Sequence, residues 1–275
     1  MTSCRENRLA TAAPAIPATP AAPAIPTVAA LRAEALKFRH AAPLRLTICM
    51  ALPMPLLGAM PYQGFQSFSA WNYWYALFLP VMLALVTGCV AQADARLGMR
   101  AVLGQGASPA QAWWAKALVC LGYSTLANLI VCAIYLACSA FTLQGFTAAG
   151  ALTMLACAGA NIVTCAWMIP AGLFLTVRFG MLAGIFAPLA VQIVGGFAWS
   201  LVPLPQLFPP SASMVIPTSF IPVLPSGEPL AADTALGEAL AANSALTLAG
   251  IVVCAAAFAL LTAATAAWFA RSEAR

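Results

Sequence analysis

Long runs of apolar residues alternate with short polar connections along most of this chain. About 20 consecutive apolar residues are enough for a helix to cross the roughly 30 Å hydrocarbon layer of a membrane. The pattern predicts six membrane-spanning helices, at residues 44–60, 73–92, 117–140, 148–177, 181–202 and 244–269. Because proline removes a backbone hydrogen bond, we expect Pro53 and Pro55 to kink the first span.

The region before the first span has two parts. Residues 1–26 are rich in alanine and proline, which predicts a disordered tail. Residues 27–42 predict an amphipathic helix with Thr27 as its N-cap and a bend at Pro43. Its expected apolar face carries Val28, Leu31, Ala35 and Phe38. The basic residues off that face are Arg32, Lys37, Arg39 and His40. Such a helix, next to a span, is expected to lie on the membrane surface.

Two longer connections separate the spans. In the connection 93–116, Ser108 followed by Pro109 is typical of a helix start, and that helix should continue into the third span. The connection 203–243 is rich in proline and carries Glu228, Asp233 and Glu238. We expect this outer loop to fold back on the membrane surface without crossing it.

Composition independently indicates a lipid environment. Hydrophobic residues make up 63% of the 275 residues, charged residues 7%, and the mean hydropathy is +0.92. Soluble domains contain roughly 45–50% apolar and about 25% charged residues, so no soluble core could enclose this much apolar surface. The nine cysteines form no CxxC pair, which favours packing over disulfide or zinc chemistry. The predicted fold class is all-α, a polytopic membrane protein.

The distribution of charge predicts the orientation. All 12 Lys and Arg residues lie before or at the start of the first span, in the connection 93–116, at Arg178, or after the last span. With six spans these four places share one side of the membrane. The positive-inside rule then puts both termini in the cytoplasm. We expect Arg45 and Lys116, at the inner ends of spans, to snorkel toward the headgroups.

Aromatic residues gather at the start of the second span. They are Trp71, Tyr73, Trp74 and Tyr75. Amphipathic rings are enriched at the level of the lipid headgroups, so we expect these four to be membrane-interface anchors.

The spans contain almost no chemistry of their own. We expect no buried Asp, Glu or His, which argues against a proton- or ion-coupled transporter. The deepest polar residues are Asn128, Asn161 and Gln192, candidates either for lining a path or for hydrogen bonds between helices. GxxxxGK[ST] and HExxH motifs are absent. We therefore expect neither a catalytic site nor a bound cofactor or metal. Any ATP would be bound by a partner subunit.

The connection 93–116 is the candidate place for such a partner to act. Its candidate coupling residues are Arg96, Arg100, Ser108, Pro109, Trp113, Trp114 and Lys116. In one interpretation, the helix that starts at Ser108 is a coupling helix that docks on a cytoplasmic ATPase. In the other, Trp113 and Trp114 merely hold an interfacial helix in the headgroup layer. The residues alone favour neither.

Several segments resemble a known family. RAEALKFRH resembles the entry helix of bacterial ABC-2-type permeases. AWNYWYALFLPVMLAL, QADARLGMRAVLGQGASPAQAWWAKAL and MIPAGLFLTVRFG resemble permease subunits of lantibiotic-protection ABC transporters of the mutacin and epidermin type. The positions that carry the resemblance are Asn72, Trp74, Tyr75, Pro80, Arg100, Ala101, Leu103, Trp114, Lys116 and Leu118. The Ala/Pro-rich tail and the less charged connection 93–116 differ from the family.

The resemblance implies a function and a set of partners. The chain would be the permease subunit of an exporter in the bacterial cytoplasmic membrane, paired with a second, similar permease and a cytoplasmic ATPase. The exporter would expel a cationic antimicrobial peptide for self-protection. No nucleic-acid partner is expected. Two alternatives stay open: an ABC-2 permease for another drug, lipid or peptide, and a non-transporting membrane anchor for a cytoplasmic factor.

Overall fold

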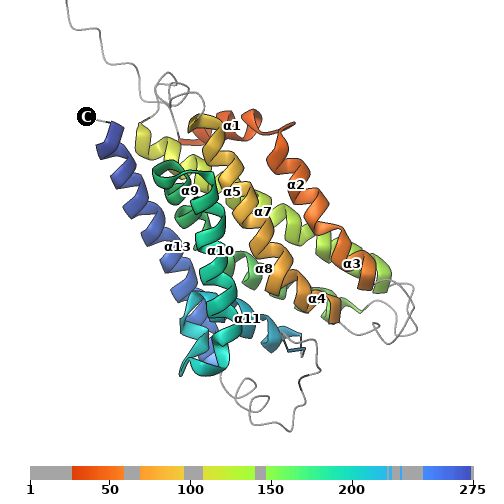
Figure 1. Cartoon of the computed structure of the whole chain (residues 1–275). Helices are drawn as coiled ribbons and strands as arrows, with labels where there is room; N and C mark the ends of the chain where they lie inside the picture. The colour runs from red at the N-terminus through yellow and green to blue at the C-terminus, as the bar shows by residue number, and fades with distance from the viewer. Residues whose placement is uncertain are drawn as a thin grey trace, which may run out of the picture.

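The protein is a bundle of helices in the computed structural model, which describes residues 27–58, 69–95, 108–139, 147–221, 223–224, 230 and 244–273 (Figure 1). The N-terminal part comprises α1 (Thr27–Lys37), α2 (Ala42–Ala51), α3 (Pro53–Gly58), α4 (Ser69–Tyr73), the π-helical turn η1 (Trp74–Phe78) and α5 (Leu79–Ala95). The rest comprises α7 (Pro109–Ser139), α8 (Ala148–Cys165), α9 (Met168–Phe179), α10 (Met181–Phe197), the 3₁₀ turns η2 (Ala198–Leu201) and η3 (Pro205–Leu207), α11 (Pro209–Phe220) and α13 (Ser244–Glu273).

Within these ranges, five helices are long and apolar enough to cross a membrane. They are Trp71–Asp94, Pro109–Cys138, Ala148–Phe179, Met181–Leu201 and Ser244–Ser272. The predicted first span corresponds to a shorter apolar helix, Ala42–Leu56. Its predicted kink is confirmed, because α2 ends at Ala51 and α3 begins at Pro53. The predicted tail 1–26 lies outside the described residues.

Prolines shape two of the long helices. Pro80 has no N–H to donate, and one turn earlier the backbone widens into η1, where the Leu79 N–H bonds to the Trp74 carbonyl. Pro170 likewise cannot donate to the Ala166 carbonyl. That carbonyl instead accepts from the Ile169 N–H at 3.0 Å, and the turn between α8 and α9 lies there.

Glycines let α5, α9 and α10 approach closely. Gly180 joins α9 to α10 with a φ of 96°, a backbone conformation that favours glycine. A Cβ on Gly184 of α10 would lie 1.8 Å from Thr176 Oγ1 and 2.8 Å from the Gly172 carbonyl oxygen of α9. A Cβ on Gly172 would in turn lie 2.6 Å from Thr87 Oγ1 of α5. The absence of side chains at these positions therefore sets the spacing of the three helices.

Part of the predicted outer loop is not on the surface. Residues 210–218 of α11 are all buried, and the helix packs against α8, α10 and α13. The expectation that this segment folds back on the membrane surface was wrong for α11. A helix pairs most of its backbone polar groups within itself, so α11 can exchange lipid or water contacts for protein contacts. Glu228, Asp233 and Glu238 lie outside the described residues.

The two ends of the bundle differ (Figure 1). At one end lie α1, the start of α2, the end of α5, the start of α7, the α9–α10 turn and the end of α13. At the other end lie α3, α4 and α11. All Lys and Arg residues in the described ranges belong to the first end: Arg32, Lys37, Arg39, Arg45, Lys116, Arg178 and Arg271.

The α1 helix packs on the bundle with a different face from the predicted one. Its buried residues are Ala30 and Glu34, followed by Phe38 in the turn after the helix. Val28, by contrast, is 76% exposed. The predicted apolar stripe was therefore wrong in part. The buried stripe keeps helical spacing, but an acidic residue stands at its centre, which is possible only where partners neutralise the charge.

Candidate functional site

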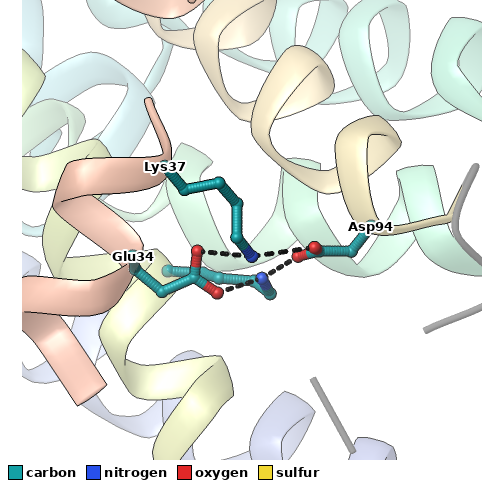
Figure 2. Close-up of polar contacts among 4 residues, drawn as sticks. Glu34, Lys37 and Asp94 are labelled. Carbon is teal, nitrogen blue, oxygen red and sulfur yellow. Dashed lines mark hydrogen bonds and ion pairs between the residues drawn. The ribbon is translucent and has the colours of Figure 1, made fainter. Parts of the chain in front are cut away.

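Four charged side chains from three helices meet inside the end of the bundle where α1 lies (Figure 2). Lys37 Nζ lies 2.9 Å from Glu34 Oε2 and 2.9 Å from Asp94 Oδ1. Lys116 Nζ lies 2.5 Å from Glu34 Oε1 and pairs with Asp94 Oδ2. Each carboxylate gives its two oxygens to two different ammonium groups. The charges therefore alternate in a closed cycle, which we call the charge ring (Glu34, Lys37, Asp94 and Lys116).

Local structure brings these four residues together. Glu34 and Lys37 are three residues apart on α1, so their side chains share one face of the helix. Asp94 stands in the last turn of α5, and Lys116 stands about two turns after the start of α7. The charge ring thus joins α1 to the two helices that flank residues 96–107.

Burial makes the pairing a strong geometric constraint. Glu34, Asp94 and Lys116 are at most 3% exposed, whereas the Lys37 side chain keeps 24% of its surface. Moving single charges out of water costs several kcal/mol for each ion, but here every charge has two neighbours of opposite sign and the sum is zero. Desolvation lowers the pKa of Lys37, but hydrogen bonds to Asp94 and Glu34 outweigh it, so the pKa is raised.

The charge ring corrects two expectations. The bundle does bury acidic residues, because Glu34 and Asp94 are both enclosed. Lys116 does not snorkel outward, since its ammonium group points into the protein toward those carboxylates. Sequence reasoning missed Glu34, which lies in the predicted surface helix 27–42, and Asp94, which lies in the connection 93–116, because charged residues in such segments are usually solvated. The four-residue spacing of Ala30, Glu34 and Phe38 was the available signal for Glu34.

The start of α7 matches the predicted helix signal. The Gln111 N–H donates to Ser108 Oγ at 3.2 Å, and the Ser108 N–H donates back to Gln111 Oε1 at 3.1 Å. This reciprocal pair is a capping box, and Pro109 opens the helix after it. Ser108 is exposed and Pro109 is half-buried, so both lie where another protein can reach them.

The paired tryptophans of α7 have different surroundings. Trp113 is buried, donates from Nε1 to Thr265 Oγ1 at 2.9 Å and stacks on Phe269 with ring centroids 4.9 Å apart. It fastens the foot of α7 to α13, and its ring is enclosed by protein. Trp114 is only partly buried. Arg96 and Arg100, the other two candidate coupling residues, lie outside the described residues.

Three of the four expected interface anchors are enclosed by protein, and for them that expectation needs correction. Trp71 Nε1 donates to Cys157 Sγ at 3.1 Å, and Trp74 Nε1 donates to Asn128 Oδ1 at 3.0 Å. The Tyr75 hydroxyl donates to the Val223 carbonyl at 3.3 Å. These partners satisfy the polar atoms of the rings inside the bundle, so headgroups are not needed. Tyr73, at 45% exposed, still faces outward.

The three deep amides also separate into two kinds. Asn128 accepts from Trp74 and donates to the Ser124 carbonyl at 2.9 Å. Gln192 accepts from Trp167 at 3.1 Å and donates to Ser213 Oγ at 2.5 Å, which holds α11 beside α10. Asn161 is fully buried, and neither atom of its carboxamide has a hydrogen-bond partner among the described residues.

The chemistry available at the charge ring is electrostatic. In the described part of the chain, no group of three or more His, Cys, Asp and Glu residues could hold a metal ion. The two carboxylates are engaged with ammonium groups, so the charge ring serves to hold helices in register rather than to bind a cation.

No family model, curated protein or solved structure matches this chain. Its class therefore follows from its own fold. By helix length and hydropathy, it is a multi-pass membrane protein with an all-α fold. The likeness to ABC-2-type permeases stays a prediction from the sequence.

Proposed function

We propose that this chain is the permease subunit of an ABC exporter that expels lantibiotics or similar cationic antimicrobial peptides. A separate ATPase subunit binds ATP, and a second, similar permease completes the pathway. The observation that carries the proposal is the charge ring. It joins α1 to the end of α5 and the start of α7, so a force applied to the connection 96–107 or to α1 reaches two long helices at once.

The orientation belongs to the same proposal. We place the end with the charge ring in the cytoplasm of a bacterium, with the chain in the cytoplasmic membrane and both termini inside. Support comes from the exposed arginines at that end, Arg32, Arg39, Arg45, Arg178 and Arg271. Such an excess of basic residues marks the cytoplasmic side of membrane proteins. Six crossings require that the shorter apolar helix Ala42–Leu56 also spans the membrane.

Fewer of the seven candidate coupling residues are available to contact an ATPase than the sequence indicated. Because Trp113 and Lys116 are turned inward, the contact with the ATPase falls to Ser108, Pro109 and Trp114, together with Arg96 and Arg100. Trp113 and Lys116 instead transmit movement to α13, α1 and α5. This division of roles rests on the accessibility of Ser108, Pro109 and Trp114, whereas Arg96 and Arg100 are included from the sequence alone.

A crosslinking experiment tests the proposal. Single cysteines at Ser108 and Ala110, in a cysteine-free background, should crosslink to an ATPase encoded beside this chain when the two are coexpressed. A cysteine at Leu204 is the matched control, because this exposed residue directly precedes η3, which packs against α11 at the opposite end of the bundle. Crosslinks that form equally from Leu204 would contradict the assignment.

Resistance to a purified lantibiotic tests the transport step. Cells that express the chain with its ATPase should survive higher concentrations than cells whose ATPase lacks its phosphate-binding lysine. Unchanged resistance with the inactive ATPase would favour a non-transporting anchor. ATPase-dependent resistance to other compounds, with none to lantibiotics, would favour a permease for another drug, lipid or peptide.

A further inference from the structure

The carboxamide of Asn161 is an unpaired hydrogen-bonding group in the middle of the bundle. Both its oxygen and its nitrogen are buried without a partner among the residues that the structure describes. Other buried side-chain atoms without partners there include the hydroxyl oxygens of Ser124, Tyr135 and Thr176, each of which is a single atom. Among the described residues, Asn161 alone has both the nitrogen and the oxygen of a side-chain amide buried without a partner.

Its neighbours along α8 show which helix it faces. Cys157, one turn before, directs its thiol at the Pro217 carbonyl of α11, 3.9 Å away. Cys165, one turn after, contacts Ser213 of α11 through its thiol. Residues four apart share a helix face, so Asn161 lies on the side of α8 that packs against α11.

The facing helix offers Asn161 no partner. Its carboxamide carries two donor hydrogens and one acceptor oxygen, and neither the nitrogen nor the oxygen is paired at the α8–α11 contact. Neither helix contains a charged residue. A ligand here would meet hydrogen-bonding groups and no countercharge.

We propose that Asn161 is a binding determinant for neutral hydrogen-bonding groups, in particular the backbone amides of a peptide ligand. An unpaired buried amide destabilises a membrane protein, and proteins keep such residues where function needs them. The inference rests on the proposed function in one respect, because it takes the transported molecule to be a peptide. It adds that Asn161 hydrogen-bonds to the uncharged backbone of the peptide and does not contact its positive charges.

Comparison with Asn128 makes the inference testable in the absence of transport. Both asparagines are fully buried in the bundle, but Asn128 is paired with Trp74 and Ser124, whereas Asn161 is not. Leucine has nearly the same shape as asparagine and needs no hydrogen bond. In the full chain in lipid nanodiscs, Asn161→Leu should leave the thermal midpoint unchanged or raise it by about 2–4 °C. Asn128→Leu should lower the midpoint.

Ligand binding is measured on the same samples with defined probes. The neutral peptide N-acetyl-leucyl-leucine amide should raise the midpoint of the wild-type chain and leave that of Asn161→Leu unchanged, because a ligand stabilises the state it binds. An Asn161→Leu variant that is destabilised like Asn128→Leu would overturn the inference. So would a probe that shifts both proteins equally, or neither. These results do not depend on the ATPase, so absent ATPase-driven resistance would count only against the proposed function.

Discussion

Asp94 at the end of α5 and Lys116 near the start of α7 form an ion pair inside the protein, and Glu34 and Lys37 of α1 close the cycle around them. The two ends of residues 96–107 are therefore fixed to each other and to α1. The ion pairs thus hold the end of α5, the start of α7 and α1 together.

Lys116→Met should strongly destabilise the protein, because Glu34 and Asp94 would then share the single ammonium group of Lys37. Breaking a buried ion pair costs about 3–5 kcal/mol. Thermal unfolding of the purified chain measures the effect. Arg45→Gln removes an exposed charge and should change stability by no more than about 0.5 kcal/mol. Equal midpoints for wild type and Lys116→Met would contradict the charge ring.

A double variant tests whether the four charges act as one unit. Glu34→Gln combined with Lys116→Gln removes one charge of each sign and leaves the Lys37–Asp94 pair intact. We expect its loss of stability to be smaller than the sum of the single losses, by about 0.5–3 kcal/mol, as for residues in one network. Strict additivity would show that the four residues are independent.

Trp113 joins α7 to α13 through Thr265 and Phe269, and weakening this contact should destabilise the protein less than breaking the charge ring does. Trp113→Phe keeps the stacking on Phe269 but loses the hydrogen bond to Thr265. The expected cost is about 0.5–1.5 kcal/mol. Thr265→Val should cost a similar amount, and the combination should cost little more, which a double-mutant cycle of unfolding free energies measures. A fully additive pair would mean that the bond contributes nothing.

Two glycines predict opposite outcomes for the same substitution. Gly184→Ala would place a Cβ against backbone atoms of Thr176 and Gly172, and forcing α9 and α10 apart should cost about 1–3 kcal/mol. Gly159→Ala meets nothing within 4 Å and should stabilise α8 by up to about 1 kcal/mol. Melting temperatures of both variants check this. Equal responses would show that α9 and α10 are not packed as described.

Alkaline pH should weaken the charge ring. The pKa of Lys37 is raised above its ordinary value of 10.5, so its contribution to stability is complete below that value and is lost as pH rises through the raised pKa. Stability of the wild type should therefore fall more steeply above pH 10.5 than that of Lys37→Met. Chemical unfolding across this range tests the difference. If the stabilities of the two proteins fell in parallel with pH, the charge of Lys37 would make no contribution to stability in this range.

Much of the fold could be predicted from the sequence because it depends on local properties. Hydropathy over about 20 residues marks a span wherever the rest of the chain lies, and five of the predicted spans are helices of sufficient length. Prolines break backbone hydrogen bonds in any context, so the interruption before Pro53 was predictable. The Ser108 helix start was predictable too, since its capping partner Gln111 is three residues away.

What the tertiary structure decided is which polar groups are buried and with whom. Glu34 and Lys116 are 82 residues apart, and Trp74 and Asn128 are 54 residues apart. No local sequence pattern can therefore predict either pair. A charge or an amide can be buried only if a partner arrives from elsewhere in the fold. The same asparagine side chain is thus satisfied at position 128 and unpaired at position 161. The sequence determined that this protein belongs in a membrane, because hydropathy is a local property, and packing decided which of its buried polar residues are paired.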